Sequence, residues 1–76
     1  MARLPSVAGH RLVRALESLG WFVHHQKGSH AVLKHAGHPE IRIVVPCHGS
    51  HPVKKGTLGR ILKDVGLSGD ALRELL

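Results

Sequence analysis

The segment 24–30 (HHQKGSH) contains three histidines, a lysine and a Gly-Ser pair, and it has no acidic residue. Histidine is the side chain best suited to proton transfer near neutral pH. Glycine lets a backbone approach a ligand closely. Phosphodiester cleavage needs an acid–base group, a cradle for the phosphate anion and a cation. The segment offers His30 as the acid–base group, Gly28 and Ser29 as the anion cradle, and Lys27 as the cation. Taken alone, the segment also fits a plain hairpin turn followed by a surface histidine.

A second group of polar and basic residues precedes and enters an expected helix. It consists of Lys54, Lys55, Gly56, Thr57, Arg60 and Lys63. Lysines before a helix N-terminus can form an anion site, because their charge adds to the free amides and the helix dipole. We expect this group to bind the phosphates of a nucleic acid. An ordinary solvated helix start is the alternative.

Eight histidines raise the question of a metal site. Such a site needs three or four converging ligands, and no spacing here matches a known zinc pattern. His24 and His25 are adjacent in an expected strand, so we expect them to point to opposite faces. We therefore expect neither a metal nor another cofactor. Cys47, the single cysteine, is interpreted as a small buried hydrophobic residue and not as a nucleophile.

The charge distribution indicates a polyanionic partner. The formal net charge is +6, and between Ser18 and Lys63 seven basic residues stand against one acidic residue, Glu40. From Asp64 onward the balance reverses. A basic body of this kind most often binds nucleic acid, and the alternative is a basic surface that serves only solubility.

The length of 76 residues predicts one domain over residues 1–76. A single cysteine excludes an internal disulfide framework. The N-terminus lacks the apolar stretch of a signal peptide, and no run is long and apolar enough to span a membrane. We therefore expect a cytoplasmic protein that does not interact with membranes.

Three strands must position the histidine segment. Residues 21–26, 30–35 and 41–45 are rich in strand-forming residues, and glycine-containing turns separate them at 27–29 and 36–40. Pro46 is expected to end the third strand. Short loops between the strands predict an antiparallel meander.

Helices flank the strands. Apolar residues at spacings of three and four predict helices over 7–19, with Ser6 as the N-cap, and from Thr57, a good N-cap, through Val65. Gly20 and Gly66 are expected to end them, and Ser68 is expected to cap a short last helix. The predicted fold is α+β, with the order α-β-β-β-α. Two helices would cover one face of a three-stranded antiparallel sheet, which is the layout of a double-stranded-RNA-binding domain.

Four motifs in this order resemble the HicA toxin family, from about residue 4 to residue 76. They are LGW, QKGSH, IVVPCHG and KKGTLGRILKDVGLS. The resemblance implies a ribosome-independent mRNA interferase that arrests growth, with His30 as its catalytic residue. It also implies a HicB-type antitoxin partner that covers the active site. Two positions depart from the family pattern: His25 stands where an arginine is frequent, and Ala8 stands where a serine is frequent.

The mechanism that we hypothesise starts with His30 accepting a proton from an RNA 2′-hydroxyl, which then attacks the adjacent phosphorus. Lys27 and the turn backbone would stabilise the phosphate charge. The products would be a 2′,3′-cyclic phosphate and a 5′-hydroxyl. Three residues are candidates for the general acid that protonates the leaving oxygen: His48, His25 and Lys27.

Two other classes of protein fit the same residues. A non-catalytic double-stranded-RNA-binding module shares the fold and the charge but does not need His30. A small regulatory interaction domain predicts neither RNA cleavage nor a steep salt dependence of RNA affinity.

Overall fold

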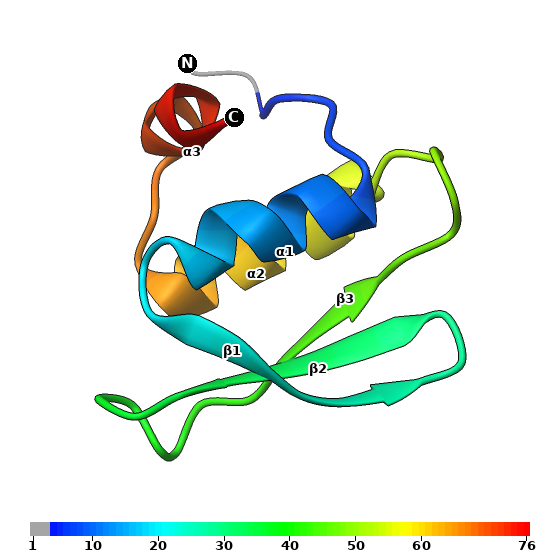
Figure 1. The fold of residues 1–76 in the computed structure, drawn as a ribbon. Helices are drawn as coiled ribbons and strands as arrows, with labels where there is room; N and C mark the ends of the chain where they lie inside the picture. Colours follow the sequence, from blue (N-terminus) through cyan, green and yellow to red (C-terminus); the bar gives the residue numbers. More distant parts are fainter. Residues whose placement is uncertain (1–3) are drawn as a thin grey trace.

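The computed structural model describes residues 4–76 and contains six elements in the predicted order. They are α1 (Gly9–Glu17), β1 (Trp21–Lys27), β2 (His30–His35), β3 (Ile43–Pro46), α2 (Lys55–Val65) and α3 (Gly69–Leu75). The three strands form one antiparallel sheet in the order β1-β2-β3. Figure 1 shows α1 and α2 on the same side of this sheet. The predicted α+β fold, with a short additional C-terminal helix, is therefore confirmed.

Alternation along the strands separates two faces of the sheet. Ala31 and Leu33 of β2 and Ile43 and Val45 of β3 are buried in one core with the apolar sides of the helices. Their partners in the core include Leu12, Leu16, Leu58, Ile61, Leu62 and Leu72. His30 and its even-numbered neighbours on β2 therefore point to the opposite face. On this face His30 is exposed, whereas Val32 is buried.

The register of the sheet carries one irregularity. Val23 pairs with Leu33 and His25 pairs with Val32, so His24 is an extra residue in β1. A bulge of this kind leaves one residue unpaired and redirects its side chain. The strand β3 also starts later than predicted, at Ile43 and not at residue 41. The reason is that the N–H of Ile41 donates to the carbonyl of His38 within the preceding turn.

Both long helices begin at residues other than those predicted. The helix α1 starts after Ala8 and not after Ser6, because Ala8 forms an isolated antiparallel bridge with Pro52 and its backbone is extended. The helix α2 starts after Lys54. The carbonyl of Lys54 already accepts a helical hydrogen bond from the N–H of Leu58 at 2.8 Å, so Thr57 lies inside the first turn.

Gly66 ends α2 as predicted, whereas α1 ends at Glu17 with Ser18 as its C-cap, two residues earlier than predicted. Gly20 and Gly66 have φ values of 97° and 74°, a conformation that glycine adopts without steric cost. The hydroxyl of Ser68 accepts a hydrogen bond from the N–H of Ala71 at 3.0 Å and caps α3. Within residues 4–76, none of the helices has the length and apolar character that crossing a membrane requires.

Candidate active site

The hairpin between β1 and β2 positions the first candidate residues. Lys27 and His30 face each other as the last pair of the ladder, and Gly28 and Ser29 form a two-residue turn between them. Gly28 has a φ of 58° whereas Ser29 has a negative φ, which is the pattern of a type II′ turn. This turn matches the twist of the strands, so it holds Lys27 and His30 side by side.

His30 lies next to a second imidazole from a distant part of the chain. The ring centroids of His30 and His48 are 5.7 Å apart, and the ring planes are nearly perpendicular, at 88°. His30 pairs with Pro46 at the end of β3, and the next residue, Cys47, donates its N–H to the carbonyl of Ser29 at 2.6 Å. Two backbone contacts therefore hold the exit of β3, and with it His48, against the turn.

The two rings have no competing partners. Within residues 4–76, neither His30 nor His48 uses a ring nitrogen in a hydrogen bond to another protein group. The side chain of His30 is on the exposed face of the sheet. Four ring nitrogens are therefore available to a ligand at this place.

A second Gly-Ser-His sequence follows β3, a repeat that sequence reasoning missed. The N–H of His51 donates to the carbonyl of His48 at 3.1 Å, and Gly49 between them has a φ of 59°. The second turn thus repeats the glycine conformation of the first. Within the described chain, however, His51 makes no ring contact, whereas His30 contacts His48. The tripeptide repeat in the sequence was the signal for this turn.

A shallow hollow of about 440 Å³, here called the turn groove, lies on the open face of the sheet around the first turn. It is lined by His25, Lys27, Gly28, Ser29, His30, Val32, Arg42 and Val44. The structure therefore brings together all four residues predicted in the first turn. Its other cation, Arg42, comes from the chain just before β3.

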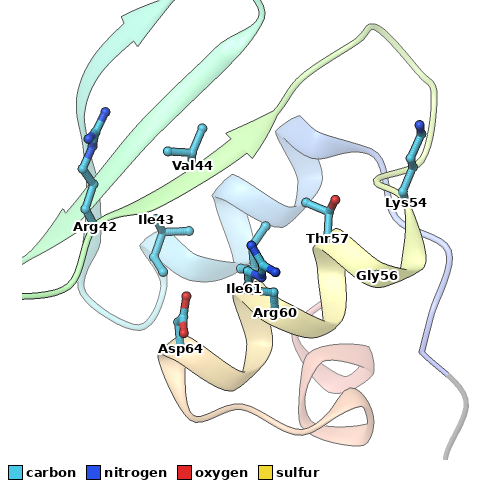
Figure 2. Close-up of a pocket in the computed structure, with 9 residues that line it drawn as sticks. All are labelled: Arg42, Ile43, Val44, Lys54, Gly56, Thr57, Arg60, Ile61 and Asp64. Atoms are coloured by element: carbon cyan, nitrogen blue, oxygen red, sulfur yellow. The ribbon is translucent and has the colours of Figure 1, made fainter.

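A larger hollow of about 690 Å³, here called the helix groove, runs between β3 and α2 (Figure 2). It is lined by Arg42, Ile43, Val44, Lys54, Gly56, Thr57, Arg60, Ile61 and Asp64. Figure 2 shows Thr57 and Arg60 on the side of α2 that faces β3. Four of the six residues predicted in the second basic group meet here. Arg42 and Val44 line both grooves, so the two hollows adjoin at these residues.

Arg42 is a residue that sequence reasoning did not select. The signal was present, because Arg42 stands between Ile41 and Ile43 in a stretch predicted to alternate. A basic residue at that position must point away from the core. The sequence could not indicate that the Arg42 side chain would lie at the boundary between the turn groove and the helix groove.

Two of the predicted basic residues lie elsewhere. The ammonium group of Lys55 donates to the carbonyl of Leu4 at 2.9 Å, and Lys55 lines a separate hollow with Leu4, Ser6 and Arg73. Lys63 is exposed and lines none of these grooves. The structure thus divides the predicted basic group between two sides of α2.

The expectation for His24 and His25 was wrong. The bulge at His24 breaks the alternation, and the Nδ1 atoms of the two rings are 3.2 Å apart, within hydrogen-bonding distance. Their ring centroids are 5.4 Å apart. Across residues 4–76, no three or more His, Cys, Asp or Glu side chains are grouped as they would need to be to hold a metal ion.

Cys47 lies beside the histidine pair without the properties of a nucleophile. It is half-buried and packs against the core. Burial raises the pKa of the Cys47 thiol, and a backbone hydrogen bond at Ala31 opposes this shift. Since the thiolate is the reactive form, a raised pKa makes the thiol less reactive at neutral pH. This agrees with its interpretation as a packing residue.

Comparison with known protein families identifies a match over most of the chain. The family described as HicA toxin of bacterial toxin–antitoxin systems matches residues 9–67. This range covers α1, all three strands, α2 and the complete turn and helix grooves. No curated protein matches the chain.

Proposed function

The chain belongs to the HicA toxin family of bacterial toxin–antitoxin systems, and from this premise we propose that it is an mRNA interferase. Its activity is ribosome-independent endonucleolytic cleavage of mRNA, which inhibits translation and growth. The observation that carries the proposal is the position of His30. Its ring has free nitrogens and lies in an open groove with Lys27, the turn backbone and Arg42.

His30 is the catalytic base in this proposal. It accepts the proton of a 2′-hydroxyl, whose oxygen attacks the adjacent phosphorus. Lys27 faces His30 directly across the hairpin, so its ammonium group lies beside the same phosphate and stabilises the charge that develops there. The positive φ of Gly28 exposes the turn amides to the same ligand. The products are a 2′,3′-cyclic phosphate and a 5′-hydroxyl.

The helix groove holds the RNA strand next to the cleaved phosphate. Arg42 connects it to the turn groove, while Lys54 and Arg60 supply charge along its length. Phosphate contacts of this kind release counterions, so the affinity falls steeply with salt concentration. Asp64 also lines this groove, and its negative charge reduces the positive potential at that place.

The partner that we propose is a HicB-type antitoxin that covers the turn groove. Family membership implies a cognate antitoxin, and the formal charge of +6 favours an acidic surface on it. The substrate, mRNA, places the activity in the cytoplasm.

The experiment that tests this function compares two forms of the toxin freed from its antitoxin. The wild-type protein is expected to cut a long mRNA without ribosomes, and His30→Ala is expected to remain folded but inactive. If His30→Ala cuts RNA at the wild-type rate, His30 is not the catalytic residue. If wild type binds RNA without cutting it, the chain is instead a non-catalytic double-stranded-RNA-binding module.

A further inference from the structure

In-line cleavage of a phosphodiester requires a proton donor for the leaving oxygen in addition to the base. The proposed function leaves that donor unassigned among His25, Lys27 and His48. The structure separates these three residues by the contacts of their side chains. His25 is engaged with the ring of His24, with Nδ1 atoms 3.2 Å apart. A lysine ammonium such as that of Lys27 is a strongly hydrated point charge, better suited to binding a phosphate than to exchanging its proton in every cycle.

His48 is the histidine whose ring contacts that of His30. The centroids are 5.7 Å apart, and the perpendicular rings are not hydrogen-bonded to each other. General acids and bases act at hydrogen-bond distance, about 3 Å from the atom they serve. Two rings at this separation can therefore both reach the oxygens of one phosphate.

The two rings also belong to different hollows. His30 lines the turn groove. His48 lines a neighbouring hollow of about 490 Å³, here called the loop groove. The loop groove is lined by Pro46, His48, His51, Pro52, Val53, Lys54 and Thr57, and it shares Lys54 and Thr57 with the helix groove. An RNA strand that lies across the boundary of the turn groove and the loop groove can present one phosphate to the edges of both rings, with the attacking oxygen toward His30 and the leaving oxygen toward His48. A base and an acid on opposite sides of the phosphorus are the arrangement that in-line displacement needs.

The position of His48 is held by contacts on both sides of it. Before it, Cys47 donates its N–H to the carbonyl of Ser29. After it, the turn at Gly49 is closed by the N–H of His51 on the carbonyl of His48. A flexible loop would leave the position of the acid variable, whereas these two hydrogen bonds hold the backbone of His48 close to the first turn.

We propose that His48 is the general acid of the reaction, an inference that rests on the proposed function. His30 removes the proton of the 2′-hydroxyl as the 2′-oxygen forms a bond to phosphorus. The bond from phosphorus to the 5′-oxygen breaks, and the proton of the protonated His48 moves to that oxygen. The cycle leaves His30 protonated and His48 neutral, and solvent restores both.

The reactive form of the enzyme therefore has a neutral His30 and a protonated His48. Because acid protonates the base and alkali deprotonates the acid, the cleavage rate is expected to have a bell-shaped dependence on pH. The charged and titratable groups that line the hollows around the pair are His25, Lys27, Arg42, His51 and Lys54. No carboxylate lines the turn groove or the loop groove within the described residues.

The test uses the leaving group. The wild-type toxin first maps a cleavage site on a long RNA, and two oligonucleotides are then made with that site. One has the natural 5′-oxygen, and the other has a bridging 5′-sulfur, which leaves as a thiolate and does not need an acid. His48→Ala is expected to cleave the oxygen substrate about 10²–10⁴-fold more slowly than wild type, and to cleave the sulfur substrate at close to the wild-type rate.

Three further variants complete the experiment. His30→Ala is expected to be slow on both substrates, because the base is needed whichever atom leaves. His10→Ala, which removes an exposed histidine of α1 that lines none of these three grooves, is expected to cleave both substrates like wild type. His48→Gln is measured beside His48→Ala and is expected to behave like it, and circular dichroism establishes that each variant is folded.

Distinct outcomes overturn the inference and the function. His48 is not the acid if His48→Ala cleaves the oxygen substrate at the wild-type rate, or if it is equally slow on both substrates. Either result leaves the role of His30 and the nuclease function intact. If the wild type does not cleave RNA, the proposed nuclease function is wrong, and so is the assignment of His48 as its general acid.

Discussion

Gly9 lies directly against the carbonyl group of Pro46, so closely that a Cβ atom on Gly9 would overlap the carbonyl oxygen. This contact joins the start of α1 to the end of β3. The following residues, Cys47 and His48, leave β3 at this point. The packing of α1 therefore influences the position of a histidine that is not part of that helix.

Replacing Gly9 with alanine is expected to destabilise the fold and to lower activity. The added methyl group must displace backbone, which typically costs about 1–3 kcal/mol in a packed region. Gly59→Ala is the matched control, because its Cβ would make only an ordinary contact with Leu4 at 3.6 Å. At this helix position alanine is expected to stabilise by about 1 kcal/mol. Urea unfolding of the three proteins measures both changes, and equal stabilities would contradict the packing argument.

Arg60 and Lys63 are three residues apart on α2 but differ in their relation to the helix groove. Arg60 lines it and Lys63 does not. Arg60→Ala is expected to weaken RNA binding and to reduce the salt dependence of the logarithm of affinity by about one unit. Lys63→Ala is expected to change both much less. The measurement is RNA affinity across a salt series, made in the inactive His30→Ala background. An equal effect of the two substitutions would show that RNA does not follow the groove.

Arg42 is expected to contribute to both binding and cleavage, because it lines the turn groove as well as the helix groove. Arg42→Gln keeps a long polar side chain and removes the charge. We expect weaker RNA affinity together with slower single-turnover cleavage. Lys34→Gln, a neutralisation on the same sheet outside both grooves, is the control. If Arg42→Gln has the RNA affinity and cleavage rate of the wild type, Arg42 is not part of the site.

His35 is expected to matter for stability and not for catalysis. Its Nε2 lies 3.0 Å from the carbonyl of Leu19 and its Nδ1 accepts the N–H of Gly37 at 2.9 Å. Its ring also packs edge-on against Trp21, with centroids 5.1 Å apart. Loss of two hydrogen bonds at roughly 1 kcal/mol each predicts a clear drop in the unfolding free energy of His35→Ala. His10→Ala, on the exposed side of α1, should be nearly neutral, and the cleavage rate of both folded variants should match wild type.

Cys47 is expected to react slowly with alkylating reagents. Burial raises the pKa of its thiol, so at a given pH less thiolate is present than for a free cysteine, and the alkylation rate should keep rising to a higher pH. Unfolding in urea should accelerate the reaction. Cys47→Ala should retain RNA cleavage. Rapid alkylation of the folded protein at neutral pH, followed by loss of activity, would indicate a catalytic thiol.

The local features of this protein could be read from its sequence. The period of apolar residues identified both long helices and the face of β3, and Gly66 ended α2 as expected, because these signals depend on neighbouring residues only. The hairpin at Gly28 and Ser29 also follows from local turn chemistry. The start of α1 could not be predicted, because a bridge to the distant residue Pro52 keeps Ala8 in an extended conformation.

The composition of the site needed the tertiary structure. Residue types and the order of the family-like motifs proposed His30 and Lys27 as site residues, because both lie in one short continuous segment. The sequence left three residues open as its acid and grouped Arg60 with Lys63. Only the folded chain places His48 against His30 and directs Arg42 and Arg60 to one groove. The physical reason is that strand pairing and helix packing, which depend on contacts between distant segments, decide which side chains share a surface.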